Sequence, residues 1–148
     1  MKIADRVKLY KNIFNDCKAL SLVQGFTMPV DRLEALEAIR NLNTELADAY
    51  MVSIPVITVW VRDNSYVPET GEIYLTEPEL EPFLHQFRHH LQNVERRYER
   101  RGLTTEGKQE WAKIPYEDCL YKLRGEDDAI AWSKFLADST KIKGENIG

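Results

Sequence analysis

A regular apolar stripe between residues 80 and 98 constrains the fold of this chain more than any other stretch. Its apolar side chains recur every three or four residues, which predicts one amphipathic helix. The residues of the stripe are Leu80, Leu84, Phe87, Leu91, Val94 and Tyr98. The helix is therefore expected to pack with one face and to turn the other face outward.

All three histidines of the chain lie in this helix. His85 and His89 are four residues apart, so their side chains lie one helical turn apart on the same side. That side is roughly opposite the apolar stripe, whereas His90 lies at the flank of the stripe. Two imidazoles at this spacing can bind one metal ion. The alternative interpretation is a pair of surface histidines whose spacing is accidental.

The other segments predict an α+β fold with a small antiparallel or mixed sheet. Helices are expected over residues 3–20 and, from an N-cap at Asp31 with Glu34 as its capping-box partner, to about Tyr50. Strands are expected over residues 54–61 and 72–76, from β-branched and aromatic content and from alternation. These two strands are expected to pair antiparallel.

The histidine helix is expected to start at residue 76 or 77, or later at Pro82. Gly102 is expected to cap its C-terminus. Residues 103–115 are expected to be irregular, and another helix is expected over 116–137 with an interruption at Gly125. The whole chain is expected to form a single domain, with N-terminal helices over 1–50, a core over 51–138 and a polar tail over 139–148.

Composition narrows the classes of partner. The chain is 43% hydrophobic and 30% charged, with a net charge of −4, which argues against a nucleic-acid partner. No apolar run approaches a membrane span and no secretory signal is evident, so a cytoplasmic protein without a membrane partner is expected. Cys17 and Cys119 are expected to be separate buried thiols. The sequence leaves the oligomeric state open.

A third metal ligand is expected from the acidic stretch at residues 126–128. Glu126 is the best candidate, because it shares a helical face with the small residues Ala129 and Ser133 and with Ile130. Small side chains would let this helix approach the histidine helix closely. Asp127 or Asp128 could orient a histidine ring by accepting the hydrogen of its other ring nitrogen. A solvated helix start is the competing interpretation of this stretch.

The stretch His85-Gln86-Phe87-Arg88-His89-His90-Leu91-Gln92 resembles the helix H-E-F-x-H-H-L-Q of small gluzincin-type zinc metallopeptidases. Glu126-Asp127-Asp128-Ala129, which follows Tyr121 and Arg124, is similar to the E-x-x-A pattern of that family. The resemblance implies a zincin-like domain in which His85, His89 and Glu126 bind zinc. It also implies metal-assisted hydrolysis of a peptide or protein, held as an extended strand along Glu72–Leu75 and Thr76.

Gln86 is the departure from this pattern. In the family a glutamate at this position takes a proton from the attacking water and passes it to the leaving amine. Gln86 can hydrogen-bond to that water but cannot accept its proton. A general base contributes on the order of 10²–10⁴ in rate, so peptidase activity is expected to be weakened or absent.

Three explanations of Gln86 are open. The protein is a pseudoenzyme that keeps a metal or peptide site for binding a partner, Gln86 is an engineered substitution, or another carboxylate serves as the base. Candidates for that base are Glu81, Glu110 and Glu117. A helical domain that binds no metal is the remaining alternative.

Overall fold

The computed structural model describes residues 16–94, 100–103, 109–111 and 126–145, with side chains for 16–94 and 126–140. This part of the chain is α+β, with four helices and two small sheets. In chain order it contains a helix over 16–24, α2 (Arg32–Tyr50), β1 (Val56–Val59), β2 (Ser65–Val67), β3 (Glu72–Leu75), α3 (Leu80–Val94), β4 (Arg100–Leu103), β5 (Gln109–Trp111) and α4 (Glu126–Glu145). Within these ranges no helix is both long and apolar enough to cross a bilayer.

Helix α2 begins where its capping signal predicts. The Asp31 carboxylate accepts a hydrogen bond from the Glu34 backbone N–H at 3.0 Å, which satisfies one of the free donors of the first turn. The helix ends at Met51, whose left-handed backbone lets its N–H bond back to the carbonyls of Ala47 and Asp48. The helix over 16–24 continues past its expected end at residue 20, and residues 1–15 lie outside the described ranges.

The expected strands exist, but the expected antiparallel pairing between them is wrong. β1 pairs with β3 in parallel, with Ile57 opposite Ile73, and β2 pairs antiparallel with β3 on its other side. The sheet is therefore mixed, with the order β1-β3-β2. A parallel pair needs a long connection. Residues 60–71 form this connection between β1 and β3, and they contain strand β2. The sequence predicts only turns in this segment.

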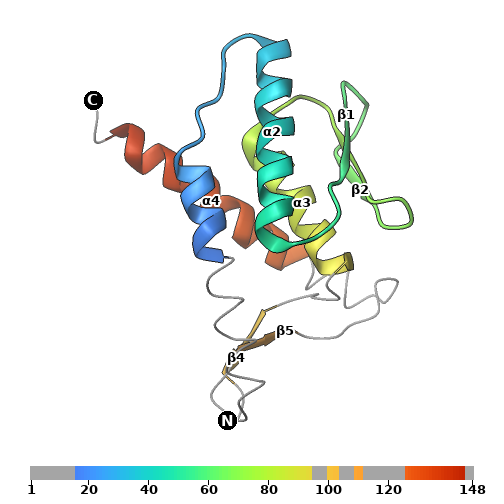
Figure 1. Ribbon diagram of the computed structural model, residues 1–148, viewed down its shortest axis with the longest axis vertical. Coiled ribbons are helices and arrows are strands. Elements are labelled where there is room, and N and C mark those ends of the chain that lie inside the picture. Colours follow the sequence, from blue (N-terminus) through green and yellow to red (C-terminus); the bar gives the residue numbers. More distant parts are fainter. Residues whose placement is uncertain (1–15, 95–99, 104–108, 112–125, 146–148) are drawn as a thin grey trace.

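Helix α3 is the centre of the packing (Figure 1). Its apolar stripe joins α2, α4 and the inner face of the sheet in one core, with Leu84, Phe87 and Leu91 almost fully buried. In Figure 1 the sheet lies to the right of α2 and α3, and α4 runs obliquely to α3. Val94 departs from the expected stripe, because it is 43% exposed. Tyr98 lies outside the described residues.

The face of α3 opposite the stripe is also buried, contrary to the expected outward face. His89 and Gln92 on that side are 7% and 0% exposed, and Arg88 at the flank of the stripe is 2% exposed. Helix α4 covers them, and its Ala129 and Ser133 are 0% and 2% exposed. These small side chains allow the close approach of the two helices that the sequence predicts.

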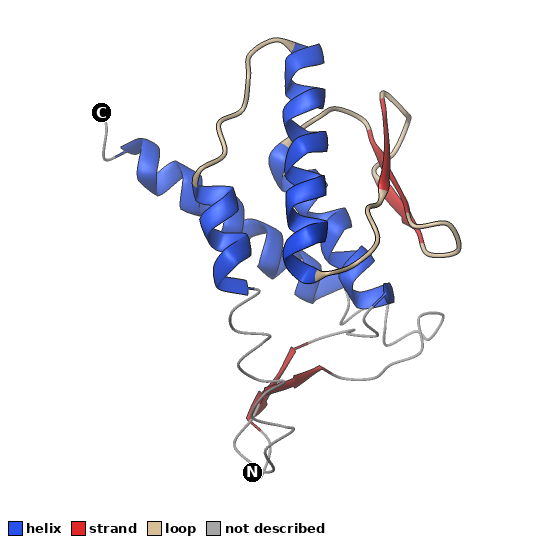
Figure 2. Ribbon diagram, in the orientation of Figure 1, coloured by secondary structure: helices blue, strands red, loops and turns tan. Residues whose placement is uncertain are grey.

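Several expected boundaries and burials are wrong. Gly102 lies inside β4 and is not a helix cap, and β4 pairs with β5 in a segment expected to be irregular (Figure 2). Helix α4 continues to Glu145, beyond the end expected at residue 137. Cys17 is exposed, not buried. Cys119 and the helix expected over 116–125 fall outside the described residues.

Candidate metal centre

The three expected ligands lie together where α4 begins beside the middle of α3. His85 Nε2 is 3.2 Å from His89 Nε2, and His89 Nε2 is 3.0 Å from Glu126 Oε2. The other oxygen of Glu126, Oε1, is 2.5 Å from His85 Nε2. Helical spacing brings the two rings together, and the first turn of α4 brings the carboxylate to them. His85, His89 and Glu126 thus form one group that could hold a metal ion.

The spacing of these atoms suits a small divalent cation. Ligand atoms bound to one tetrahedral zinc ion at about 2.0–2.1 Å lie about 3.3 Å from one another. The two imidazole nitrogens, 3.2 Å apart, and His89 Nε2 and Glu126 Oε2, 3.0 Å apart, are close to this edge. The 2.5 Å between His85 Nε2 and Glu126 Oε1 is a hydrogen-bond length and would have to increase around a metal ion. Three electron-pair donors at such distances repel each other unless a proton or a metal ion lies among them. Two nitrogens and an oxygen are also a ligand set that first-row divalent ions accept.

The ionisation of the cluster favours the forms that bind metal. Burial lowers the pKa of the His85 imidazole, and this effect outweighs the opposing attraction of the Glu126 carboxylate. The hydrogen bond with His89 is the largest of the effects that lower the pKa of Glu126. A neutral imidazole and an ionised carboxylate are the forms that coordinate a cation, because a bound proton must otherwise be released.

A buried hydrogen-bond chain orients His89. The Nδ1–H of His89 donates to Gln92 Oε1 at 2.9 Å, and Gln92 Nε2 donates to Asp128 Oδ2 at 2.9 Å. Asp128 in turn accepts from Arg88 Nε at 2.8 Å. Because Nδ1 is held as the donor to Gln92, a metal ion at this group would replace the proton shared between His89 Nε2 and Glu126 Oε2, and a neutral His89 would offer Nε2 as its ligand atom. Asp128 thus acts on the ring through Gln92, not by the direct contact expected for Asp127 or Asp128.

His90 has a different role from the other two histidines. Its Nε2–H donates to the Ser53 carbonyl at 2.7 Å, and its Nδ1 accepts from the Tyr66 hydroxyl at 2.8 Å. Asn93 Nδ2 donates to that same hydroxyl. His90 therefore ties α3 to β2 and to the loop before β1. It uses both ring nitrogens in doing so and does not join the group formed by His85, His89 and Glu126.

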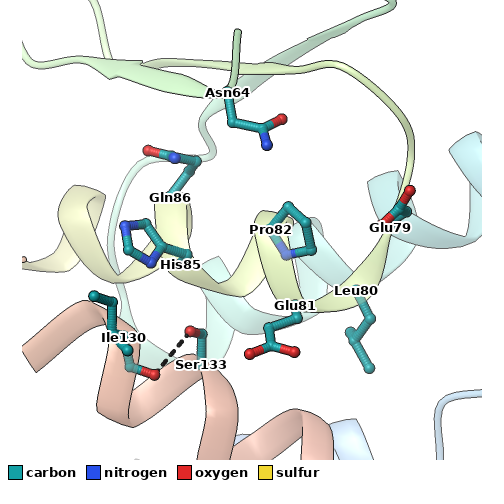
Figure 3. A pocket seen from close by; sticks show the side chains of 9 residues that line it. All are labelled: Asn64, Glu79, Leu80, Glu81, Pro82, His85, Gln86, Ile130 and Ser133. Atoms are coloured by element: carbon teal, nitrogen blue, oxygen red, sulfur yellow. Dashed lines mark hydrogen bonds between the residues drawn. The ribbon is translucent and has the colours of Figure 1, made fainter.

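Gln86 lies beside His85 in the wall of a cavity of about 500 Å³ (Figure 3). Asn64 lines the cavity from the loop after β1, and Ile130 and Ser133 line it from α4, where the Ser133 hydroxyl donates to the Ile130 carbonyl at 3.2 Å. Glu81, one of the alternative bases, also lines this cavity. The side chains of the other two, Glu110 and Glu117, lie outside the described residues.

The expected peptide-binding strand is in the wrong place for that role. Residues Glu72–Leu75 form β3, the central strand of the sheet. β3 is already paired with β1 on one side and with β2 on the other, so neither of its edges is free for a peptide. Thr76 follows β3, and its N–H donates to Asn64 Oδ1 at 2.8 Å. A free edge of this sheet for pairing with another chain belongs to β1 or β2 instead.

Sequence reasoning selected the three clustered residues but missed Arg88, Asn64 and Glu79. In the sequence, Gln92 is only the last residue of the histidine motif, and its helical position places it on the same side as His89. Its position, together with the acidic start of α4, is the one signal that could have suggested the chain to Asp128. Comparisons with protein-family models, with curated proteins and with solved structures give no match.

Proposed function

We propose that this protein is a zincin-like metal-binding protein in which His85, His89 and Glu126 hold a zinc ion. The observation that supports this most directly is the convergence of three ligand atoms within 4.8 Å of one another. The hydrogen bond from His89 to Gln92 adds to it, because it directs a lone pair into the cluster. Zinc bound at such a site supplies Lewis-acid chemistry, polarising a carbonyl group and lowering the pKa of water.

Gln86 decides how much peptide hydrolysis the site performs. It occupies the position of the glutamate in the gluzincin pattern, and its amide can orient a water or a peptide carbonyl by hydrogen bonding. It cannot accept a proton from the attacking water and then donate that proton to the leaving amine, as amide hydrolysis requires. We therefore propose a metallopeptidase-like protein whose hydrolysis is weak or absent, with a peptide or protein as its substrate or partner.

Zinc titration tests the metal site. The full chain, stripped with a chelator, is titrated with zinc in competition with a chromophoric chelator, and elemental analysis gives the stoichiometry. We expect one zinc per chain, and a large loss of affinity in Glu126→Gln. Asp127→Asn is the matched control, because Asp127 is the adjacent exposed acid and lies outside the cluster. The proposal fails if both variants bind zinc as the parent chain does.

A second candidate function is a non-catalytic module that uses the same cavity to bind a peptide or protein. Gln86 favours this binding function. Its amide can make the hydrogen bonds that a glutamate would make in the site, but it cannot act as a general base. Gln86→Glu distinguishes the two functions. Zinc-dependent cleavage of a peptide library that appears only in this variant indicates a peptidase site without its base. If neither form cleaves while both hold zinc, the binding module is the better description.

A further inference from the structure

We propose that the cavity beside His85 and Gln86 binds the cationic side chain, lysine or arginine, of a peptide segment. This inference names the substrate class of the proposed metal centre, and its peptide component rests on that proposed function. It follows from three separate properties of the cavity wall: its charge, its free hydrogen-bonding groups and its apolar surface.

The wall of the cavity carries negative charge from two glutamates. Glu79 and Glu81 both line the cavity, and both are exposed. Within the described residues neither carboxylate has an ion-pair or hydrogen-bond partner, and no lysine or arginine lines the cavity. Two unneutralised carboxylates beside a half-enclosed space attract a cation and disfavour an acidic ligand.

The hydrogen-bonding groups point to a bound ligand and not only to a charged surface. Gln86 lines the cavity and is 8% exposed, yet its amide has no hydrogen-bond partner among the described residues. The amide nitrogen and oxygen reach solvent, because among the described residues only Asn43 Oδ1 is both buried and without a hydrogen-bond partner. Both amide atoms of Gln86 are therefore available to a ligand in the cavity. Asn64 uses Oδ1 to accept from Thr76, so its Nδ2 remains available at the cavity. The side-chain amides of Gln86 and Asn64 can therefore hydrogen-bond to the N–H and C=O groups of a peptide backbone.

The apolar part of the wall favours a long side chain over a small cation. Leu80 and Pro82 on α3 face the space, and Ile130 on α4 is 49% exposed beside it (Figure 3). Lysine and arginine bury a chain of methylene groups along apolar surface while the charged end reaches polar groups. A cavity of about 500 Å³ is large enough for such a side chain with its adjoining peptide unit.

Three acetylated tripeptide amides test the proposal: Gly-Lys-Gly, Gly-norleucine-Gly and Gly-Glu-Gly. Norleucine keeps the methylene stem of lysine and lacks its charge. Binding to the full chain, with zinc and with a chelator, is followed by NMR shifts of the side-chain amides of Gln86 and Asn64. We expect the lysine peptide to bind about three- to tenfold more tightly than the norleucine peptide, with the glutamate peptide weakest.

The preference for lysine should disappear in the Glu79→Gln, Glu81→Gln double variant. Both residues are exposed, so we expect the fold to tolerate the loss of their charge. Glu37→Gln is the control, because Glu37 is exposed on α2 and does not line the cavity. Equal binding of the lysine and norleucine peptides, a preference that survives the double variant, or no shift with millimolar lysine peptide each overturns the inference.

The result separates this inference from the proposed metal site. Lysine-selective binding that persists in chelator supports the cavity proposal even if the zinc titration fails. Stoichiometric zinc without lysine selectivity leaves the metal centre standing and refutes the cavity proposal alone.

Discussion

At the scale of single residues, Gln92 decides which nitrogen of His89 faces the cluster. The amide is fully buried, and its orientation is fixed because its NH2 donates to Asp128. Its oxygen must then face the His89 ring and accept the Nδ1–H. An aliphatic side chain at position 92 would leave the ring free to place its proton on Nε2, where the proton would block the metal.

We therefore expect Gln92→Leu to raise the zinc Kd about 10–100-fold, the usual effect of removing a partner that orients a metal ligand. Chelator competition measures the affinity. The ¹⁵N NMR shifts of the His89 ring in the metal-free chain report which nitrogen carries the proton. A general loss of packing would not favour one tautomer over the other, so this measurement separates the two causes. An unchanged zinc affinity in Gln92→Leu would show that the hydrogen bond is incidental.

A reciprocal exchange provides the control for this prediction. Gln92→Glu combined with Asp128→Asn keeps an acceptor for His89 and a donor–acceptor pair between the two helices. We expect this double variant to recover most of the zinc affinity that Gln92→Leu loses. Gln92→Glu alone should recover less, because it places two carboxylates against each other.

The clustered residues could be predicted from the sequence for local reasons. The spacing of His85 and His89 fixes their relative position within one helix, and the small residues Ala129 and Ser133 mark the face of α4 that approaches them. The hydrogen-bond chain through Gln92 could not be predicted. It depends on the register of α4 along α3, which is set by long-range packing and not by any local pattern.

At the scale of elements, one buried ion pair clamps α3 to α4. The Arg88 side chain is 2% exposed and that of Asp128 13% exposed, and two guanidinium nitrogens contact the carboxylate at 2.8 and 3.4 Å. The same guanidinium lies 5.2 Å from the ring centroid of Trp132, which stacks on Phe87. Charge, cation–π contact and apolar packing therefore hold in one register the two helices that carry His85, His89 and Glu126.

Asp128→Ala should destabilise the chain by about 3–5 kcal/mol, because it leaves the Arg88 charge buried without its carboxylate. Urea unfolding measures this, with chelator present so that loss of metal does not contribute. Asp127→Ala, one residue away and exposed, should change the free energy of unfolding by no more than about 0.5 kcal/mol. Equal effects of the two variants would contradict the clamp.

The elements with local start and stop signals were the predictable ones. Helix α2 follows from the cap at Asp31, whereas β2 has three residues and exists because β3 pairs with it. The pairing of β1 with β3 in parallel is also non-local, since it depends on β2 forming within their connection. The burial of both faces of α3 could not be read from its own stripe, because α4 supplies the second layer.

At the scale of the whole molecule, His90 joins three parts of the fold and makes its stability depend on pH. Its ring is 1% exposed and connects α3 to Ser53 and to Tyr66 of β2. Burial lowers the pKa of His90 below its ordinary value of 6.5, although the hydrogen bond to Ser53 opposes this. The folded chain thus holds His90 neutral at a pH where the unfolded chain protonates it.

This histidine therefore stabilises the fold fully above about pH 6.5, and its contribution is lost as the pH falls from there through the lower folded pKa. In that window one such group changes the free energy of unfolding by at most about 1.4 kcal/mol per pH unit. His90→Gln keeps a donor for the Ser53 carbonyl but does not titrate. Urea unfolding in chelator, from about pH 7.5 to about pH 5, should show a shallower loss of stability in this variant.

His85 contributes equally to both chains, so the difference in slope isolates His90. Parallel pH curves would mean that His90 does not govern the acid sensitivity of the fold.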